Sequence, residues 1–463
     1  MGQEGFSIFI LAAGKATRFK SEYPKLLHAL GGRPMGEYVL RAALDAGADR
    51  VYMIIGHKAE EMRKAFARPR VEFIEQKEQL GTGHAMMTSR PELERCPSDA
   101  VVTLVGDVPL LQARTLRGLV EAHLEARAAC TILTMRVDNP TGYGRIVRGS
   151  GQRVRAIVEE KVAGPAQKKI REVSTGILCF SRQPLLAYMG ELAPANAQKE
   201  FLLTDMIEIF GRHRLKVGAF EAPPGEALGI NDRAQLAELG KALRRRKVLT
   251  LMKEGVTLVD PDTTCVDEDV EIGSDTVIEP GVSLRGRTRL GSGCRLEPFS
   301  TITDSLLGAG VTVRQSCVIT NCVIHTGATV GPFAHLREGA VIEPSARIGN
   351  FVEVKKSTIG QGAKALHLTY LGDATVGAHA NIGAGTVTCN YDGQNKHPTT
   401  IEDEVFIGSG NMLVAPVRIG KGSYTAAGST INEDVPPDSL AIGRARQVNK
   451  VGWAHEHKRR KRQ

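Results

Sequence analysis

Aromatic residues are scarce in this 463-residue chain, which has one tryptophan and eight tyrosines. Long apolar runs are also missing, so we expect neither a membrane-spanning segment nor a signal peptide. The eight cysteines are scattered without a CxxC pair, which excludes the usual zinc spacing and argues against a disulfide framework. We therefore expect reduced thiols and a cytoplasmic protein.

Acidic residues are fewer than basic ones, and the formal net charge is +9. Part of the excess lies in two short runs, residues 244–247 and residues 457–462. Neither run contains interleaved aromatic residues or a nucleic-acid-binding motif, so we expect an exposed helix face and a solvated tail, with no nucleic acid as partner. A basic surface would also attract anionic sugar phosphates.

Glycine, in contrast, is abundant, with 50 residues, as fits a fold built from tight turns. In the second half of the chain, aliphatic residues recur every six positions with Gly, Ser, Pro, Asp and Asn between them. The recurring positions are Ile272, Ile278, Leu284, Leu290, Leu296 and Ile302, then Ile324, Val330, Leu336, Ile342, Ile348 and Val354, then Ile401, Ile407, Leu413, Ile419, Thr425 and Ile431. A period of six is neither helical nor a simple alternation, and it is typical of the hexapeptide coils of a parallel β-helix. The pattern breaks at residues 388–404, where we expect a loop that leaves the β-helix.

The first half of the chain alternates short apolar runs with amphipathic ones. The pattern predicts strands at 7–14, 51–56, 71–76 and 100–111, and helices at 35–47, 60–67 and 113–128. This alternation indicates a mostly parallel sheet covered by helices, in which ligands bind beyond the carboxyl ends of the strands. A single long helix is predicted from about 231 to 254. We therefore expect three parts, residues 1–233, 234–254 and 255–463.

Two loops at strand ends carry the chemistry of the first part. In LAAGKATRF, Gly14 allows the backbone to approach a phosphate, and Arg18 and Lys25 supply positive charge. In VGDVPLL, Asp107 follows a buried strand and suits Mg²⁺, a cation that prefers carboxylate and phosphate oxygens. Asn231, in GINDR, is a second candidate ligand, and the alternative is that it caps the following helix.

These motifs resemble the signature of sugar-1-phosphate nucleotidyltransferases. Together with HLREGA, FVEVKKS, HLTYLGD and NYDG in the β-helix, they resemble, from Leu11 to Arg444, the bacterial bifunctional N-acetylglucosamine-1-phosphate uridyltransferase / glucosamine-1-phosphate N-acetyltransferase family. The resemblance implies an α/β nucleotidyltransferase domain (Rossmann-like, with a mostly parallel sheet) followed by a left-handed parallel β-helix, in a homotrimer. It also implies UTP, acetyl-CoA, glucosamine-1-phosphate and N-acetylglucosamine-1-phosphate as substrates, and Mg²⁺ as cofactor.

In the first domain, the resemblance assigns catalysis to Arg18 and Lys25 and Mg²⁺ ligation to Asp107 and Asn231. The positions that it assigns to the nucleotide and the sugar are Leu11, Ala12, Ala13, Gly14, Lys25, Gln76, Gly81, Thr82, Gly144, Glu159, Ser174 and Asn231. An amide and backbone groups can read the edge of a pyrimidine, and a carboxylate can accept hydrogen bonds from sugar hydroxyls.

In the β-helix, the resemblance makes His367 the general base, as suits a side chain that titrates near neutral pH. The sugar phosphate would be bound by Arg337, Lys355, Tyr370 and Asn381. Acetyl-CoA would be bound by Ala384, Asn390, Tyr391, Ser409, Ala427 and Arg444. In the family this site lies between neighbouring subunits.

Two positions depart from the family pattern. Ala16 replaces a glycine of the phosphate loop, which would strain the loop by about 1 kcal/mol if the position needs φ > 0. Ser174 replaces an asparagine of the sugar pocket and has a shorter reach. Three alternatives therefore stay open: a different amino sugar or nucleotide as substrate, a weakened nucleotidyltransferase site, and a non-catalytic scaffold. The charged site residues are all present, which argues against the scaffold.

Overall fold

The computed structural model describes residues 5–14, 17–194 and 199–461, which fall into two compact units, Met1–Leu243 and Arg244–Gln463. In the described part of the chain, no helix combines the length and the apolar character that a membrane span requires. The functional boundaries at 233/234 and 254/255 stay a prediction.

The first unit is built on a mostly parallel sheet with the strand order β11-β7-β10-β6-β1-β4-β5. Its strands are β1 (Phe6–Ala12), β4 (Arg50–Ile55), β5 (Val71–Glu75), β6 (Ala100–Val105), β7 (Cys130–Arg136), β10 (Glu172–Ser181) and β11 (Val217–Glu221), with the hairpin β8 (Arg145–Arg148) and β9 (Val154–Val158) beside β10 and the short pair β2 (Ala29–Leu30) and β3 (Arg33–Pro34). Strand β10 runs antiparallel to both neighbours, and the remaining pairs along this order are parallel.

Helices cover both faces of this sheet. They are α1 (Met35–Asp45), α2 (Ala59–Phe66), α3 (Thr82–Thr88), α4 (Arg90–Arg95), α5 (Ala113–Ala126), α6 (Pro165–Lys168), α7 (Arg182–Tyr188) and α8 (Met206–Arg212), with the 3-10 turns η1 (Thr17–Phe19), η2 (Lys25–Leu27), η3 (Ser150–Gln152), η4 (Met189–Glu191) and η5 (Leu203–Asp205). In β1, Ile8 and Ile10 belong to one core cluster and Phe9 to the other, as expected for a strand buried on both faces. The predicted strand at 100–111 was too long, because β6 ends at Val105 and a turn follows it.

The long helix predicted between the two patterns is confirmed as α9 (Arg233–Lys253). Its residues Leu239 and Leu243 belong to a core cluster of the first unit, and Val248 and Leu251 to the core of the second. The basic run 244–247 was predicted to be an exposed helix face, but it is only partly exposed. Lys247, for example, donates hydrogen bonds to the carbonyls of Glu268 and Val270.

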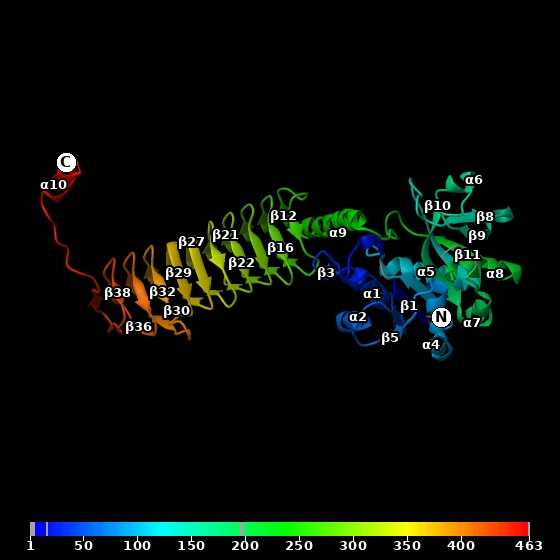
Figure 1. Ribbon diagram of the computed structural model, residues 1–463, viewed down its shortest axis with the longest axis horizontal. Coiled ribbons are helices and arrows are strands. Elements are labelled where there is room, and N and C mark those ends of the chain that lie inside the picture. Colours follow the sequence, from blue (N-terminus) through cyan, green and yellow to red (C-terminus); the bar gives the residue numbers. More distant parts are fainter. Residues whose placement is uncertain (1–4, 15–16, 195–198, 462–463) are drawn as a thin grey trace. The chain divides into compact units, whose positions relative to one another are not determined.

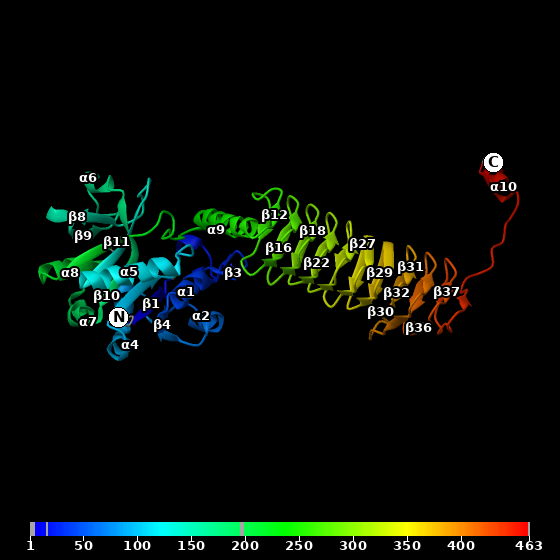
Figure 2. The same ribbon diagram turned by 180° about the vertical axis from the view of Figure 1, so that it is seen from behind.

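The second unit is a parallel β-helix of the left-handed hexapeptide type, confirming the prediction, and its short strands stack coil upon coil (Figure 1; the same stack from behind in Figure 2). The first face contains β12 (Thr257–Leu258), β15 (Val277–Ile278), β18 (Arg295–Leu296), β21 (Thr312–Val313), β24 (Thr329–Val330), β31 (Asn381–Ile382), β34 (Phe406–Ile407), β37 (Tyr424–Thr425) and β39 (Leu440–Ala441). The second face contains β13 (Cys265–Val266), β16 (Ser283–Arg285), β19 (Thr301–Thr303), β22 (Val318–Thr320), β25 (His335–Leu336), β32 (Val387–Cys389), β35 (Met412–Val414) and β38 (Thr430–Ile431). The third face contains β14 (Glu271–Ile272), β17 (Arg289–Leu290), β20 (Leu306–Leu307), β23 (Val323–Ile324), β26 (Val341–Ile342), β28 (Thr358–Ile359), β30 (Ala374–Val376), β33 (Thr399–Ile401) and β36 (Val417–Ile419).

Two longer strands, β27 (Arg347–Lys355) and β29 (Lys364–Gly372), bend from the first face to the second. The residues between these two faces form what we call the first edge. They have positive φ and are Gly281, Phe299, Ser316, Phe333, Phe351, Leu368, Gly385, Gly410 and Gly428. The short helix α10 (Trp453–Arg460) follows the last coil.

The aliphatic residues of the six-residue repeat fill the core of the β-helix, as predicted. Ile342, for instance, is fully buried and pairs with Ile359 one coil later. The predicted loop at 388–404 is shorter in the structure. Strand β32 continues to Cys389 and β33 rejoins the third face at Thr399, so the loop spans residues 390–398.

A buried histidine makes the stability of the first unit depend on pH. His123 in α5 is 1% exposed, and burial lowers its pKa from 6.5 to about 4. The Ser181 hydroxyl donates to the Ala128 carbonyl, so its oxygen accepts from the ring Nε2–H at 3.1 Å, and Thr131 donates to Nδ1 at 3.0 Å. The neutral ring therefore has both nitrogens satisfied.

We predict that this histidine destabilises the first unit in acid. The unfolded chain takes up the proton near pH 6.5 and the folded chain only near pH 4, so the free energy of unfolding falls by about 3 kcal/mol as the pH drops through this window. Urea unfolding at a series of pH values would measure the loss. The His123→Gln variant lacks this contribution, and parallel pH curves for the variant and the wild type would contradict the prediction.

Candidate active sites

The first unit contains a cleft of about 910 Å³ at the carboxyl edge of its sheet. Leu11 in β1 pairs with Val105 in β6, so the loops that follow these two strands are neighbours, as predicted. The cleft is lined by many of the residues proposed from the sequence, namely Leu11, Ala12, Ala13, Gly14, Arg18, Lys25, Gln76, Gly81, Thr82, Asp107 and Asn231. Ala16 lies outside the described residues.

Two backbone hydrogen bonds bring the charged residues of this cleft together. The Gly106 N–H donates to the Leu11 carbonyl at 3.2 Å, and the Ile230 N–H donates to the Asp107 carbonyl at 2.9 Å. As a result Lys25 forms an ion pair with Asp107, and Arg18 Nη2 donates to Asn231 Oδ1 at 2.7 Å. Asp232, rather than Asn231, caps α9, because its Oδ1 accepts from Gln235 N.

The donor chemistry at Asp107 and Asn231 fits a hard divalent cation. Both side chains offer oxygen, the ligand that such ions prefer. Among the described residues, no group of three or more His, Cys, Asp or Glu side chains is arranged to hold a metal ion. An ion here would therefore need further oxygens from a bound phosphate.

A buried amide also lines the cleft. Gln76 is 3% exposed, and its Nε2 donates to the Gly81 carbonyl at 3.2 Å. Gly81 has φ +108°, and a Cβ at this position would lie 2.5 Å from the Phe201 carbonyl oxygen, so only glycine fits here. Thr82 begins α3, and its hydroxyl accepts from Leu203 N.

Gly144, Glu159 and Ser174 form a separate cluster. Ser174 N donates to the Gly144 carbonyl at 2.8 Å, and a Cβ at Gly144 would lie 3.3 Å from Glu159 Oε1. Burial raises the pKa of Glu159, and the nearby Asp205 raises it further. Burial and the charge of Asp107 both raise the pKa of the hydroxyl of Tyr143, the residue before Gly144.

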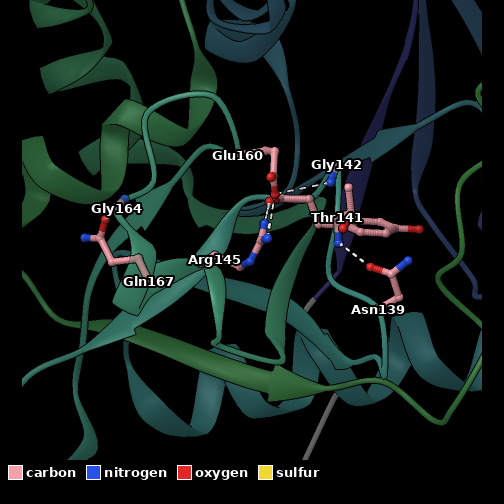
Figure 3. A network of polar contacts seen from close by, with 8 residues as sticks. Asn139, Thr141, Gly142, Arg145, Glu160, Gly164 and Gln167 are labelled. Atoms are coloured by element: carbon pink, nitrogen blue, oxygen red, sulfur yellow. Dashed lines mark hydrogen bonds and ion pairs between the residues drawn. The ribbon is translucent and has the colours of Figure 1, made fainter.

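Arg145 is a structural residue of this cluster that the sequence pattern did not reveal. Its guanidinium is 1% exposed, forms an ion pair with Glu160 at 2.5 Å and donates to the Tyr143 carbonyl. The Glu160 carboxylate also accepts from Gly142 N, so it joins the loop before β8 to the segment after β9 (Figure 3). This ion pair between a buried Arg145 and a half-buried Glu160 therefore holds Gly144 next to Glu159.

In the β-helix, five of the predicted residues form one column along the first edge. His367 precedes Leu368, and Ala384, Ser409 and Ala427 precede Gly385, Gly410 and Gly428. Successive coils are joined by hydrogen bonds from Gly385 N to Leu368 O, from Gly410 N to Ala384 O and from Gly428 N to Ser409 O. Arg444 continues the column, because a Cβ at Gly428 would lie 4.0 Å from its Cδ.

His367 is exposed and has a partner one coil below it. Its Nδ1 donates to Asn350 Oδ1 at 3.0 Å, which leaves Nε2 as the acceptor nitrogen. Asn350 pairs with His367 across β27 and β29, 17 residues away. The length of one coil was the signal in the sequence that could have identified Asn350.

A cluster of cations lies at the far edge of the second face. Arg337 Nη1 is hydrogen-bonded to Glu353 at 2.7 Å, and Glu353 pairs with Tyr370 on the next coil. The Lys396 ammonium beside Lys355 lowers the pKa of Lys355, and Arg337 adds to the effect. Lys396 was missed in the sequence, although it lies in the predicted loop. Such a concentration of positive charge favours an anion.

The remaining predicted residues lie away from the column. Asn381 begins β31 on the first face, whereas Tyr370 and Lys355 lie on the second. Asn390 is buried at the base of the loop, where it donates to Asp373 Oδ2, and Tyr391 is 60% exposed. One chain alone therefore presents the predicted acetyltransferase residues on two faces of the β-helix.

Comparisons with known proteins agree with this division of the chain. Residues 8–195 match the MobA-like NTP transferase domain, and residues 398–433 match the bacterial transferase hexapeptide (six repeats). The chain thus combines a nucleotidyltransferase domain with a hexapeptide transferase domain.

Full-length relatives cover both parts. The "Bifunctional protein GlmU" of Trichlorobacter lovleyi is 49% identical over 446 residues, which is 96% of this chain and 97% of the relative. The protein of the same name from Koribacter versatilis is 47% identical over 97% of this chain and 96% of its own length. That from Anaeromyxobacter sp. is 49% identical over 97% of this chain and 92% of its own length. The chain belongs to this family of bifunctional GlmU proteins.

Proposed function

We propose that the chain makes UDP-N-acetylglucosamine in two steps, each at one of the two sites described above. As a GlmU protein with both transferase domains, it is a bifunctional uridyltransferase and acetyltransferase. The assignment of the two sites is carried by one observation, which is that the two sets of predicted residues lie in different units. The cleft with Arg18, Lys25 and Asp107 belongs to the first unit, and the column that contains His367 belongs to the second.

In the acetyl transfer, His367 Nε2 takes a proton from the amine of glucosamine-1-phosphate, and the amine nitrogen attacks the thioester carbon of acetyl-CoA. The carbon–sulfur bond breaks, and the CoA sulfur leaves as the thiolate. Asn350 keeps the acceptor nitrogen of His367 available, because it holds the proton on Nδ1. Arg337, Lys355 and Lys396 bind the phosphate, Tyr370 and Asn381 contact the sugar, and Ala384, Asn390, Tyr391, Ser409, Ala427 and Arg444 bind acetyl-CoA.

In the uridyl transfer, a phosphate oxygen of N-acetylglucosamine-1-phosphate attacks the α-phosphorus of UTP. The bond to the β-phosphate breaks and pyrophosphate leaves. Arg18 and Lys25 stabilise the charge that develops on the α-phosphate, and Leu11 to Gly14 supply the backbone around it. Gln76, Gly81 and Thr82 contact the uracil, and Gly144, Glu159 and Ser174 contact the sugar. Asp107 and Asn231 would hold Mg²⁺, which neutralises triphosphate charge when it is bound.

An exposed apolar ridge supports the trimer that the resemblance implies. Phe299, Phe333, Phe351 and Leu368 lie along the first edge, with the half-buried Ser316 between Phe299 and Phe333, and are 70%, 45%, 57% and 63% exposed. Each has φ > 0, a backbone conformation that costs a bulky residue about 1 kcal/mol. Exposed apolar side chains held at such a cost favour burial against a second copy of the chain. The ridge adjoins His367, so a neighbouring subunit would complete the acetyltransferase site.

A cytoplasmic location is part of the same proposal. All eight cysteines are free, as expected for a protein of a reducing compartment.

We predict that the two activities can be lost one at a time. His367→Ala should lower the kcat of acetyl transfer by about 100-fold or more, because the general base is lost, and leave uridyl transfer unchanged. Asp107→Ala should lower uridyl transfer by about 100-fold and leave acetyl transfer unchanged. CoA release and pyrophosphate release measure the two steps.

The chain offers matched controls for both variants. His325→Ala removes a half-exposed histidine of another coil, and Asp138→Ala removes a fully exposed carboxylate of the first unit. Both should keep both activities. Loss of both activities in either active-site variant would contradict the assignment of one reaction to each unit.

We also predict that Phe351→Asp dissociates the trimer, because it places a charge in the apolar ridge. Light scattering should then report monomers, acetyl transfer should fall at least tenfold, and uridyl transfer should change less than about twofold. Leu306→Asp is the control, since Leu306 is 48% exposed on the third face, opposite the first edge. A Phe351→Asp monomer with full acetyltransferase activity would show that the site needs no second subunit.

A further inference from the structure

Gln76 is held by two acceptors, one of which the sequence motifs did not single out. Its Nε2 lies 3.2 Å from the Gly81 carbonyl oxygen and 2.9 Å from Nδ1 of His84, in the third position of α3. A carbonyl oxygen can only accept, so the amide nitrogen of Gln76, and not its oxygen, must face Gly81. The second amide hydrogen then points to His84, whose Nδ1 must act as an acceptor.

This arrangement determines what Gln76 offers to a ligand. Both hydrogens of its amide are used by Gly81 and His84, and among the described residues no donor contacts its Oε1. Gln76 lines the cleft. The free acceptor of the side chain is therefore the group available to a bound base.

We propose that His84 is a positioning residue that makes the nucleotide site selective for uracil, by fixing the Gln76 amide with its oxygen toward the base. Uracil carries a donor, N3–H, where cytosine carries an acceptor, N3. An amide oxygen held opposite this position accepts from uracil and repels the lone pair of cytosine. The inference rests on the proposed role of Gln76 in contacting uracil.

His84 itself need not touch the nucleotide for this effect. Its ring packs against Phe201 at 6.2 Å between ring centroids, and Phe201 N donates to the Leu80 carbonyl next to Gly81. The ring is thus held on the protein side of the amide. Without its Nδ1, the Gln76 amide keeps one acceptor only and can rotate, so that the amide nitrogen becomes available to cytosine.

The test compares kcat/KM for UTP, CTP and dTTP in the intact protein, measured as pyrophosphate release with N-acetylglucosamine-1-phosphate and Mg²⁺. In His84→Leu the UTP/CTP ratio should fall about tenfold, the effect of one hydrogen bond. The UTP/dTTP ratio should stay constant, because thymine carries the same N3–H and O4 groups as uracil. His84→Asn, which can place an amide oxygen near the position of Nδ1, should restore the UTP/CTP ratio.

Further variants distinguish a failure of this inference from a failure of the proposed contact between Gln76 and uracil. If Gln76→Leu abolishes the preference for UTP over CTP and His84→Leu does not alter it, Gln76 contacts the base and the role of His84 is wrong. If Gln76→Leu leaves the preference intact, the assignment of Gln76 fails and the inference fails with it. An equal loss for all three nucleotides in His84→Leu, not rescued by His84→Asn, would show a merely structural role. The urea unfolding transition of the first unit verifies that each variant is folded.

Discussion

The register of the stacked coils is the constraint on which the acetyltransferase half depends. Each aliphatic residue of the six-residue repeat packs directly above the one in the coil below, as Ile359 does on Ile342, and the parallel backbone hydrogen bonds keep this alignment. Residues one coil apart are therefore neighbours in the structure. Asn350 meets His367 for this reason, and the same alignment brings Ala384, Ser409 and Ala427 into line with His367. A slip of one residue would separate His367 from Asn350 and turn the core residues outward.

The first unit obtains its site from a different constraint, the common edge of parallel strands. Because β1 and β6 are paired in parallel, their carboxyl ends coincide, and the loops with Arg18, Lys25 and Asp107 meet there. The hydrogen bond from Ile230 to Asp107 brings Asn231 to the same place from a segment far along the chain. The ion pair between the buried Arg145 and Glu160 adds the cluster of Gly144, Glu159 and Ser174. Two unrelated packing rules thus provide two independent sites in one chain.

Most of the fold could be predicted from the periodic patterns of the sequence. The six-residue repeat predicted the β-helix and its core, and the strand–helix alternation predicted the mostly parallel sheet and its ligand-binding edge. The predicted residues that line the cleft were found through their motifs. Three features were not predicted from the sequence, because they depend on partners that are distant along the chain. Lys396 contacts Lys355 only after the loop folds back, Arg145 is recognisable only from its burial, and the true loop length depends on β33 pairing with the third face.

The central claim is that one chain acetylates glucosamine-1-phosphate and then uridylates the product. A ³¹P NMR time course of the intact protein with glucosamine-1-phosphate, acetyl-CoA, UTP and Mg²⁺ tests it most directly. The account predicts that N-acetylglucosamine-1-phosphate appears first and is then converted to UDP-N-acetylglucosamine with release of pyrophosphate. Accumulation of N-acetylglucosamine-1-phosphate without any nucleotide sugar, or a nucleotide sugar formed without acetyl-CoA, would contradict it.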